Sequence, residues 1–364
     1  MLIAELDTPA VLIDLDIAER NMLRLASYCR EKNLRLRPHT KTHKIPELAH
    51  KQLELGACGI TVAKPSEARV MVDAGIQDVL VAYPIVTDLK AKELAQLADR
   101  AKITVSLDSN EAATALSRQA SAHGVHIDVM VEIDVGFRRC GVGNEEQALS
   151  LARRIMDLPG LEFQGLMFYP GHMLAEESER RRLLTAVNEC LDRIQQALQQ
   201  AGCTINCISG GSTPTAFMSH EFHGVTEIRP GMYAFNDRNM LTIKTCDLSE
   251  CAVSVVVTVV STAVPGRAIV DGGSKTFSSD GLLAGSREGY GLLLDDQDTK
   301  FASVSEEHGH LNISNSSRTY KVGDRLSILP NHVCATINMH DQVYATRNDK
   351  VQSVWRVAGR GKLQ

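Results

Sequence analysis

The chain has 364 residues, of which 44% are hydrophobic and 23% are charged, and its formal net charge is −5. This length predicts two domains, or one large barrel with an appended domain. The slightly acidic balance argues against a nucleic-acid or membrane-surface partner, so a small-molecule ligand is expected.

The sequence also indicates a cytoplasmic protein. It contains no run of about 18 apolar residues that would span a membrane, and its first residues lack the basic start and apolar run of a signal peptide. Nine cysteines, an odd number without framework-like spacing, fit reduced thiols better than disulfides.

The first unusual segment after the initial strand (6–16) and helix (17–32) is a basic stretch, RLRPHTKTHK, at residues 35–44. Its side chains alternate as in an extended strand. Leu34, Leu36 and Pro38 share one face, and the opposite face carries Arg35, Arg37, His39 and Lys41. Burying that basic face is costly without a partner, and we expect a ligand to supply it.

Lys41 stands at the end of this strand. A desolvated lysine beside other cations has a lowered pKa and can form an imine with an aldehyde. The alternative is a solvated edge strand with basic ends, although the Pro-His pair and the regular alternation make this alternative weaker.

Strand-like runs then alternate with segments of helical periodicity. Eight such runs are expected, at residues 34–40, 58–63, 78–83, 103–108, 127–134, 161–168, 204–209 and 224–228. Between them lie expected helices at residues 65–74, 89–98, 110–123, 146–156 and 176–200. Eight alternations predict an α/β fold of the (β/α)₈ TIM-barrel type over residues 14–240. A doubly wound open sheet is the competing prediction.

Polar and glycine-rich segments follow the expected strands. They are Lys41, DVGFRRCGV (134–142), YPGH (169–172), GGSTPT (210–215) and RPGMY (229–233). Barrel enzymes commonly hold phosphate in the loops after the last two strands. A lysine after the first strand together with such a phosphate cup describes a pyridoxal phosphate site.

Residues 241–364 change to β-rich segments without intervening helices and predict a smaller all-β domain, to which the N-terminal strand (1–13) is added. Within it, His332 and Cys334 share one face if the segment is extended, and zinc binds such pairs. A buried cysteine beside a surface histidine is the alternative interpretation. The run 306–309 (EEHG) either adds ligands or is a polar loop.

The motifs RPHTKTHK, DVGFRRCGV, GGSTPT, RPGMY, SEEHG and PNHVCATIN, in this order, resemble the metal-activated D-threonine aldolase and D-serine dehydratase-like family. Its members are fold-type III pyridoxal phosphate enzymes with an alanine racemase-like barrel, usually dimeric. The resemblance implies catalytic roles for Lys41, Tyr169, His172 and Arg139. It implies cofactor binding by Lys41, His39, Arg139, Tyr169, Gly211, Ser212, Thr213, Gly231, Met232 and Tyr233, and metal binding by His332 and Cys334.

Two positions depart from the aldolase pattern, and the C-terminal segment agrees with it. Aldolases of this family carry an acidic residue where this chain has Cys334, and the dehydratase branch has cysteine and uses zinc. The segment from Asn338 to the C-terminus resembles the aldolase branch. Aldolases have a histidine after the matching tyrosine, whereas here Pro170 follows Tyr169 and His172 is the nearest imidazole.

The resemblance implies an enzyme, a lyase that cleaves Cα–Cβ of β-hydroxy-D-amino acids as D-threonine aldolase does. The first alternative is a D-serine or D-threo-3-hydroxyaspartate dehydratase, in which Lys41 removes the α-proton. An amino-acid racemase and a non-catalytic pyridoxal phosphate-binding protein are weaker alternatives. The expected cofactors are pyridoxal 5'-phosphate and a divalent metal, with zinc favoured by the thiolate and manganese or magnesium as alternatives. We expect a homodimer.

Overall fold

The computed structural model describes residues 1–174, 177–283 and 289–364. Contacts between residues divide the chain into two compact units. The barrel unit comprises residues 24–41, 46–231 and 362–364, and the β unit comprises residues 1–23, 42–45 and 232–361. The long helix α1 (Leu15–Glu31) begins in the β unit and ends in the barrel unit.

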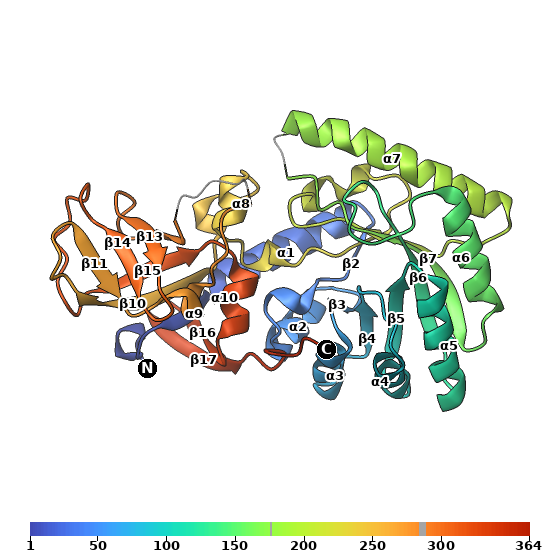
Figure 1. The fold of residues 1–364 in the computed structure, drawn as a ribbon, viewed down its shortest axis with the longest axis horizontal. Coiled ribbons are helices and arrows are strands. Elements are labelled where there is room, and N and C mark those ends of the chain that lie inside the picture. Colours follow the sequence, from blue (N-terminus) through green and yellow to red (C-terminus); the bar gives the residue numbers. More distant parts are fainter. Residues whose placement is uncertain (175–176, 284–288) are drawn as a thin grey trace. The chain divides into compact units, whose positions relative to one another are not determined.

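Eight parallel strands form the sheet of the barrel unit (Figure 1). They are β2 (Arg35–Leu36), β3 (Ile60–Val62), β4 (Asp78–Val81), β5 (Lys102–Leu107), β6 (Ile127–Ile133), β7 (Leu161–Phe168), β8 (Cys207–Gly210) and β9 (Glu227–Ile228). The order β2-β9-β8-β7-β6-β5-β4-β3 follows the chain around the sheet. A parallel bridge between His39 and Thr61 links the segment after β2 to β3 and closes the barrel. The predicted (β/α)₈ barrel is therefore confirmed, and the open sheet is excluded.

Helices connect successive strands of the barrel. They are α2 (Pro46–Glu54), α3 (Pro65–Asp73), α4 (Asp88–Ala98), α5 (Asn110–His123), α6 (Glu145–Asp157) and α7 (Glu177–Gln200). The expected helices after residues 65, 89, 110 and 146 coincide with α3 to α6 within a few residues. The last expected helix matches α7, except that its predicted first residue, Glu176, lies outside the described residues.

Alternation along the barrel strands separates two cores. Val79 and Val81 belong to the large cluster that packs between the sheet and the helices, whereas Leu80 lies between them in sequence and joins a small cluster inside the barrel. Met130 and Cys207 contribute to the same inner cluster. Because β4, β6 and β8 are alternate strands, these side chains form one layer of the barrel interior.

The β unit contains a nine-stranded sheet in the order β11-β14-β13-β12-β15-β10-β1-β16-β17, with a further β11–β10 pairing that closes six strands into an antiparallel barrel. The strands are β1 (Ala10–Asp14), β10 (Val253–Ser261), β11 (Arg267–Val270), β12 (Gly291–Leu293), β13 (Lys300–Val304), β14 (Gly309–Asn312), β15 (Arg325–Pro330), β16 (Gln342–Arg347) and β17 (Lys350–Arg356). β1 pairs with β10 and β16, so the N-terminal strand is part of this sheet.

Two expectations for the β unit are corrected. Short helices interrupt the strands, namely α8 (Arg238–Thr242), α9 (Ser274–Phe277) and α10 (Val333–Met339). The His-x-Cys segment is not extended, because His332 is the N-cap residue of α10 and Cys334 is its second residue. The run 306–309 turns from β13 into β14, where Glu307 pairs with Lys275 at the surface.

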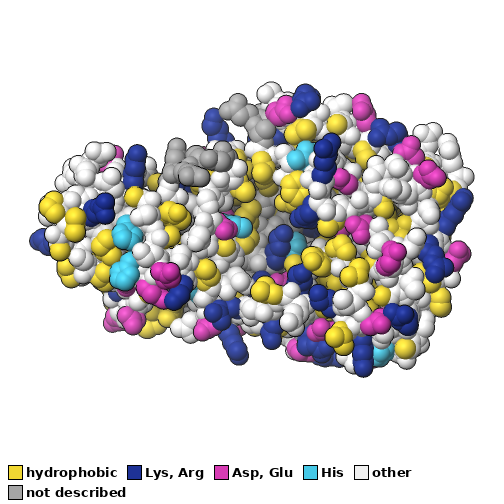
Figure 2. All heavy atoms as spheres, in the orientation of Figure 1, with side chains coloured by type: hydrophobic (Ala, Val, Ile, Leu, Met, Phe, Trp, Pro, Cys, Tyr) yellow, Lys and Arg dark blue, Asp and Glu magenta, His cyan; other side chains and the backbone are white. Residues whose placement is uncertain are grey.

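None of the described helices is long and apolar enough to cross a membrane. On the face drawn in Figure 2, basic and acidic side chains are interspersed rather than gathered into one area of a single sign.

Candidate active site

The segment between β2 and α2 carries the lysine that the sequence analysis singled out. Lys41 lies in a 3₁₀ turn (Thr40–Thr42), not on the strand, and it is an exposed residue in the described part of the chain. The expectation of a desolvated lysine at a strand end is therefore corrected. His39, two residues before it, is buried and accepts a weak hydrogen bond on Nδ1 from the Lys41 backbone N–H at 3.4 Å. Burial lowers the pKa of His39 well below its usual range, and the charges of Lys41, Arg229 and Arg139 lower it further.

His39, Lys41, Arg139 and Arg229 all lie in segments that directly follow strands of the barrel unit. Glu132 on β6 interacts with two of these side chains. Burial raises the pKa of its carboxyl group, and the positive charges of Arg139 and Arg229 act against that rise. Its carboxylate accepts a hydrogen bond from Ser106 on β5 at 3.0 Å. A cationic, partly desolvated mouth is suited to an anionic cofactor and an amino-acid carboxylate.

The side chain of Asp134 holds the loop after β6 in shape. Asp134 Oδ1 accepts hydrogen bonds from the N–H groups of Gly136 and Arg138, each at 2.9 Å. Gly141 has φ +111°, and a Cβ there would lie 2.4 Å from the Asp134 backbone nitrogen, so only glycine fits. The loop places the Arg139 guanidinium 4.7 Å from the centre of the Tyr169 ring, which follows β7.

His172, the imidazole after β7, has two notable features. Within the described part of the chain, its buried Nδ1 atom has no hydrogen-bond partner. Burial lowers the pKa of the ring, against the opposing charge of Asp134, so the imidazole is neutral near pH 7. A neutral ring with an unbonded nitrogen can accept a proton.

The loop after β8 carries the residues that the sequence analysis expects to bind phosphate. Gly211 takes φ +90°, and Ser212 and Thr213 are buried directly after it. The Ser212 backbone N–H donates to Thr215 Oγ1 at 3.0 Å, which fixes the loop in a tight turn. Gly231, after β9, is the last residue of the barrel unit before its short C-terminal segment, and Met232 and Tyr233 begin the first 3₁₀ turn of the β unit.

The His-x-Cys pair lies at the start of α10 in the β unit. His332 Nδ1 lies 2.6 Å from Asp280 Oδ2, and the Cys334 thiol donates to Thr42 Oγ1 at 3.4 Å. Burial alone would lower the pKa of His332, but hydrogen bonds to Cys334 and Asp280 raise it to about 10. Asp237 Oδ2 accepts from the Val333 N–H at 3.0 Å and so anchors the first turn of α10.

This donor set fits a metal ion. An imidazole oriented by a carboxylate and placed beside a thiol is a common zinc arrangement. Among the residues that the structure describes, no group of three or more histidine, cysteine or acidic side chains is arranged to hold an ion. Residues 306–308 therefore add no third ligand within this part of the chain, and the pair would leave positions open for water or substrate.

The basic strand required one correction, because the partners of its arginines are protein carboxylates and not a ligand. Arg37 Nε donates to Glu227 Oε2 at 2.9 Å, and its Nη1 donates to Asp78 Oδ1 at 2.6 Å. Arg35 lies 3.6 Å from Glu227 with about half of its side chain exposed. Both arginines stand at the amino-terminal end of the barrel, away from the loops that follow the strands.

Sequence reasoning missed Arg229, the first residue of the RPGMY motif. Its guanidinium is buried, donating to Ser209 Oγ at 2.6 Å and to the Phe168 carbonyl at 2.8 Å. Burial lowers its pKa to about 10. The sequence signal that could have identified Arg229 is an arginine within a motif, directly after an expected barrel strand.

Comparison with known proteins identifies the two parts of the chain. The alanine racemase N-terminal domain matches residues 13–239, and the putative serine dehydratase domain matches residues 252–346. The chain is 33% identical to a D-threonine aldolase of an Arthrobacter species, over 99% of this chain and 94% of that protein. The crystal structure of D-threonine aldolase from Filomicrobium marinum superposes with a TM-score of 0.93 at 35% identity, covering 99% of this chain and 98% of the other.

A dehydratase is similar to nearly the same extent. The D-threo-3-hydroxyaspartate dehydratase of Delftia sp. HT23 has a TM-score of 0.90 at 32% identity, covering 98% of both chains. Solved variants of that enzyme replace a histidine and, two positions further on, a cysteine by alanine, and the cysteine variant is described as metal-free. The matches extend over both units at above 30% identity. The chain therefore belongs to the D-threonine aldolase and D-serine dehydratase-like family of fold-type III pyridoxal phosphate enzymes.

Proposed function

We propose that this protein is a pyridoxal phosphate- and metal-dependent lyase that cleaves the Cα–Cβ bond of β-hydroxy-D-amino acids, giving glycine and an aldehyde from D-threonine. The likeness to D-threonine aldolases over both units supports this reaction class. The geometry adds a cationic barrel mouth and a histidine–cysteine pair in the second unit.

The barrel residues fit the cofactor. Lys41 is an exposed residue whose amine would form the covalent link to an aldehyde, and Ser212, Thr213 and Gly231 lie in the loops suited to phosphate. When bound, pyridoxal phosphate accepts the electron pair released at Cα, and a divalent ion acidifies a hydroxyl group that contacts it. Arg139, fixed over Tyr169, supplies a positive charge for the cofactor or the substrate carboxylate.

The proposal of aldolase rather than dehydratase chemistry rests on His172. Cα–Cβ cleavage requires removal of the proton from the substrate β-hydroxyl, and the base must be unprotonated at working pH. His172 meets this requirement through its pKa, which burial lowers below the usual value. We therefore assign His172 as the general base, in place of the histidine that directly follows the tyrosine in related aldolases.

The second candidate function is dehydration, which would release the β-hydroxyl and yield a 2-oxo acid and ammonia. Cys334 favours it, because the spacing from His332 equals that of the two residues replaced in the Delftia dehydratase variants. In that reaction Lys41 would remove the α-proton, and His172 would not be needed as a base.

Product identification with protein loaded with pyridoxal phosphate and zinc tests the proposal. We expect glycine and acetaldehyde from D-threonine, and neither from L-threonine. His172→Gln should lower kcat by about 10²-fold or more, the scale of lost general-base catalysis, while His126→Gln, an exposed histidine, should not. A 2-oxo acid and ammonia as the main products would instead establish the dehydratase.

Three further expectations stay predictions. These are the homodimer, the cytoplasmic location and the domain boundary between residues 240 and 241. Zinc as the bound metal is also a prediction, based on the preference of a thiolate ligand for a borderline ion.

A further inference from the structure

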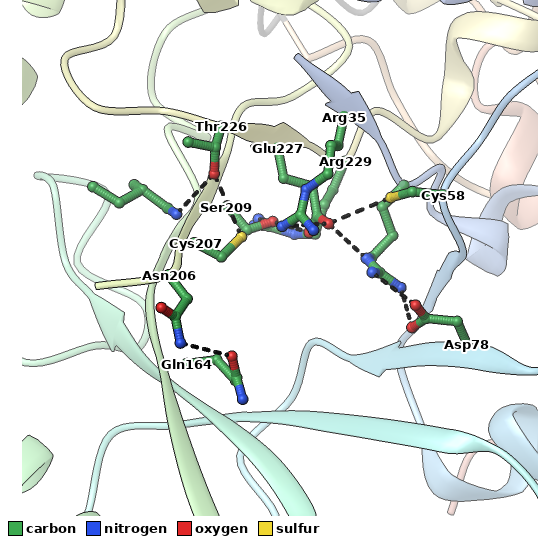
Figure 3. Close-up of polar contacts among 12 residues, drawn as sticks. Arg35, Cys58, Asp78, Gln164, Asn206, Cys207, Ser209, Thr226, Glu227 and Arg229 are labelled. Carbon is green, nitrogen blue, oxygen red and sulfur yellow. Dashed lines mark hydrogen bonds and ion pairs between the residues drawn. The ribbon is translucent and has the colours of Figure 1, made fainter. Parts of the chain in front are cut away.

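The amino-terminal ends of the barrel strands enclose a hollow, at the opposite mouth of the barrel from the candidate active site. It has a volume of about 80 Å³ and is lined by residues of β2 and of β4 to β9. By the usual requirement of 10–15 Å³ for one water, it has room for about six waters or one small molecule. Figure 3 labels three of its polar lining residues, Arg35, Asn206 and Gln164.

The carboxylates inside this mouth are already paired. Glu227 Oε2 accepts from Arg37, and Glu227 Oε1 accepts from Ser209 Oγ at 2.7 Å. At the rim, Asp128 accepts from Gln164 Nε2 at 3.1 Å and forms an ion pair with Lys102 at 3.0 Å. No carboxylate of the described lining is therefore left to attract a cation.

The hydrogen-bond donors of the rim, in contrast, are in excess. Arg35 has five N–H groups, and its contacts are a hydrogen bond to the Cys207 thiol and an ion pair with Glu227 at 3.6 Å, so N–H groups remain for a further acceptor. More than half of the Lys102 side chain is exposed, at 59%, so its ammonium group can donate further bonds. The amide of Asn206 uses one of its two N–H groups on Gln164 Oε1 at 3.2 Å. Excess donors around a hollow select an anion.

The floor is apolar. Leu80, Met130 and Cys207, the inner layer of the barrel, line the hollow beneath the polar rim. A fully hydrated inorganic ion gains nothing from such a floor, whereas a short alkyl group loses contact with water there. The combination of donors above and apolar side chains below matches a carboxylate with a short tail.

We propose that this amino-terminal pocket binds a small carboxylate of about four to seven non-hydrogen atoms, with the carboxylate on Arg35 and Lys102 and the tail on Leu80 and Met130. None of its lining residues belongs to the candidate active site.

Fluorine NMR with trifluoroacetate as the probe tests this proposal on the protein loaded with pyridoxal phosphate. We expect saturable binding that acetate displaces, and an affinity at least tenfold lower in the Arg35→Gln/Lys102→Gln variant, as expected for losing charge-assisted hydrogen bonds. The matched control, Lys92→Gln/Arg153→Gln, removes two exposed charges elsewhere on the barrel helices and should bind like the wild type.

Equal binding by the Arg35→Gln/Lys102→Gln variant and the wild type would place the probe elsewhere and overturn the proposal. Absence of saturable binding would overturn it too. Displacement by phosphate or chloride but not by acetate would reject the carboxylate assignment in favour of an inorganic anion site. If the double variant does not fold, Lys102→Gln alone decides between the same outcomes, since this side chain is mostly exposed.

Discussion

Lys41 and Lys44 stand three residues apart but in different surroundings. Lys41 is exposed, whereas Lys44 is buried with φ +57° and donates from Nζ to Asn338 Oδ1 at 2.8 Å. We predict that Lys41→Ala abolishes the yellow colour of the bound cofactor and the borohydride-trapped adduct. Lys44→Ala should keep both and lose about 1 kcal/mol of stability with its hydrogen bond. An adduct that survives in Lys41→Ala and vanishes in Lys44→Ala would refute the assignment of the reactive lysine.

Substitution of Thr213 tests whether the loop after β8 binds the cofactor phosphate. If its hydroxyl donates to the cofactor phosphate, Thr213→Ala should weaken cofactor binding by about 1–3 kcal/mol, the usual effect of losing a hydrogen bond to a charged group. Thr185→Ala, which alters an exposed threonine on α7, is the control. Dissociation constants from cofactor titration provide the measurement. Unchanged retention in a Ser212→Ala/Thr213→Ala variant would remove this loop from the site.

The strands β2, β4, β8 and β9 are joined inside the barrel by one chain of polar contacts. It runs from Arg229 through Ser209 and Glu227 to Arg37, and then to Asp78 (Figure 3). Arg37 and Glu227 are both buried, so removal of the Glu227 charge leaves the buried Arg37 guanidinium with one carboxylate fewer. We predict that Glu227→Gln lowers the free energy of unfolding by about 3–5 kcal/mol, as measured by urea denaturation.

The same residue gives a pH dependence of stability. Burial tends to raise the pKa of Glu227, but Arg37, Ser209 and Arg35 together hold it below its usual value of 4.5. A carboxyl with a depressed folded-state pKa stabilises the protein above about pH 4.5 and loses this contribution as the pH falls toward the folded-state pKa. As the pH falls below about 4.5, the free energy of unfolding should therefore decrease less in Glu227→Gln than in the wild type or in the exposed control Glu162→Gln. Parallel curves for all three proteins would contradict this account.

Apolar runs and helical periodicity in the sequence predicted most strands and helices of the barrel unit. The barrel strands were found because apolar runs and helical segments alternate regularly from residue 34 to residue 228. Beyond residue 241 the sequence predicted strands at 252–262, 267–270, 325–329, 342–346 and 351–355. It missed β12 to β14, because they are only three to five residues long and contain glycine or polar residues. α10 was missed because a seven-residue helix has too few turns to show periodicity.

Partners that are distant in sequence could not be predicted from local patterns. The basic face of strand β2 was recognised, but its carboxylate lies 190 residues away, so the expected ligand was the wrong partner for Arg37. Asp280, which orients His332 from 52 residues away, was missed for the same reason. The candidate site residues themselves came from motifs, and their roles stay predictions.

The proposal assigns the cofactor to residues of the barrel unit and the metal to residues of the β unit, and metal removal tests these two assignments separately. We predict that chelation abolishes turnover but leaves the fold and the cofactor colour intact, because Lys41 and the phosphate loop belong to the barrel and the metal pair to the β unit. Circular dichroism and visible absorbance are the measurements, and re-addition of zinc is the control. Full activity after chelation would exclude a catalytic metal, and loss of fold would show a structural one.

The most direct test of the proposed Cα–Cβ cleavage follows D-threonine in deuterated water by proton NMR at early times. An aldolase breaks the bond to Cβ, so glycine should appear with one deuterium at Cα alongside acetaldehyde, while unreacted D-threonine keeps its α-proton. Formation of 2-oxobutanoate, or exchange of the α-proton in threonine ahead of glycine formation, would contradict the proposal, since either result requires cleavage of the Cα–H bond instead.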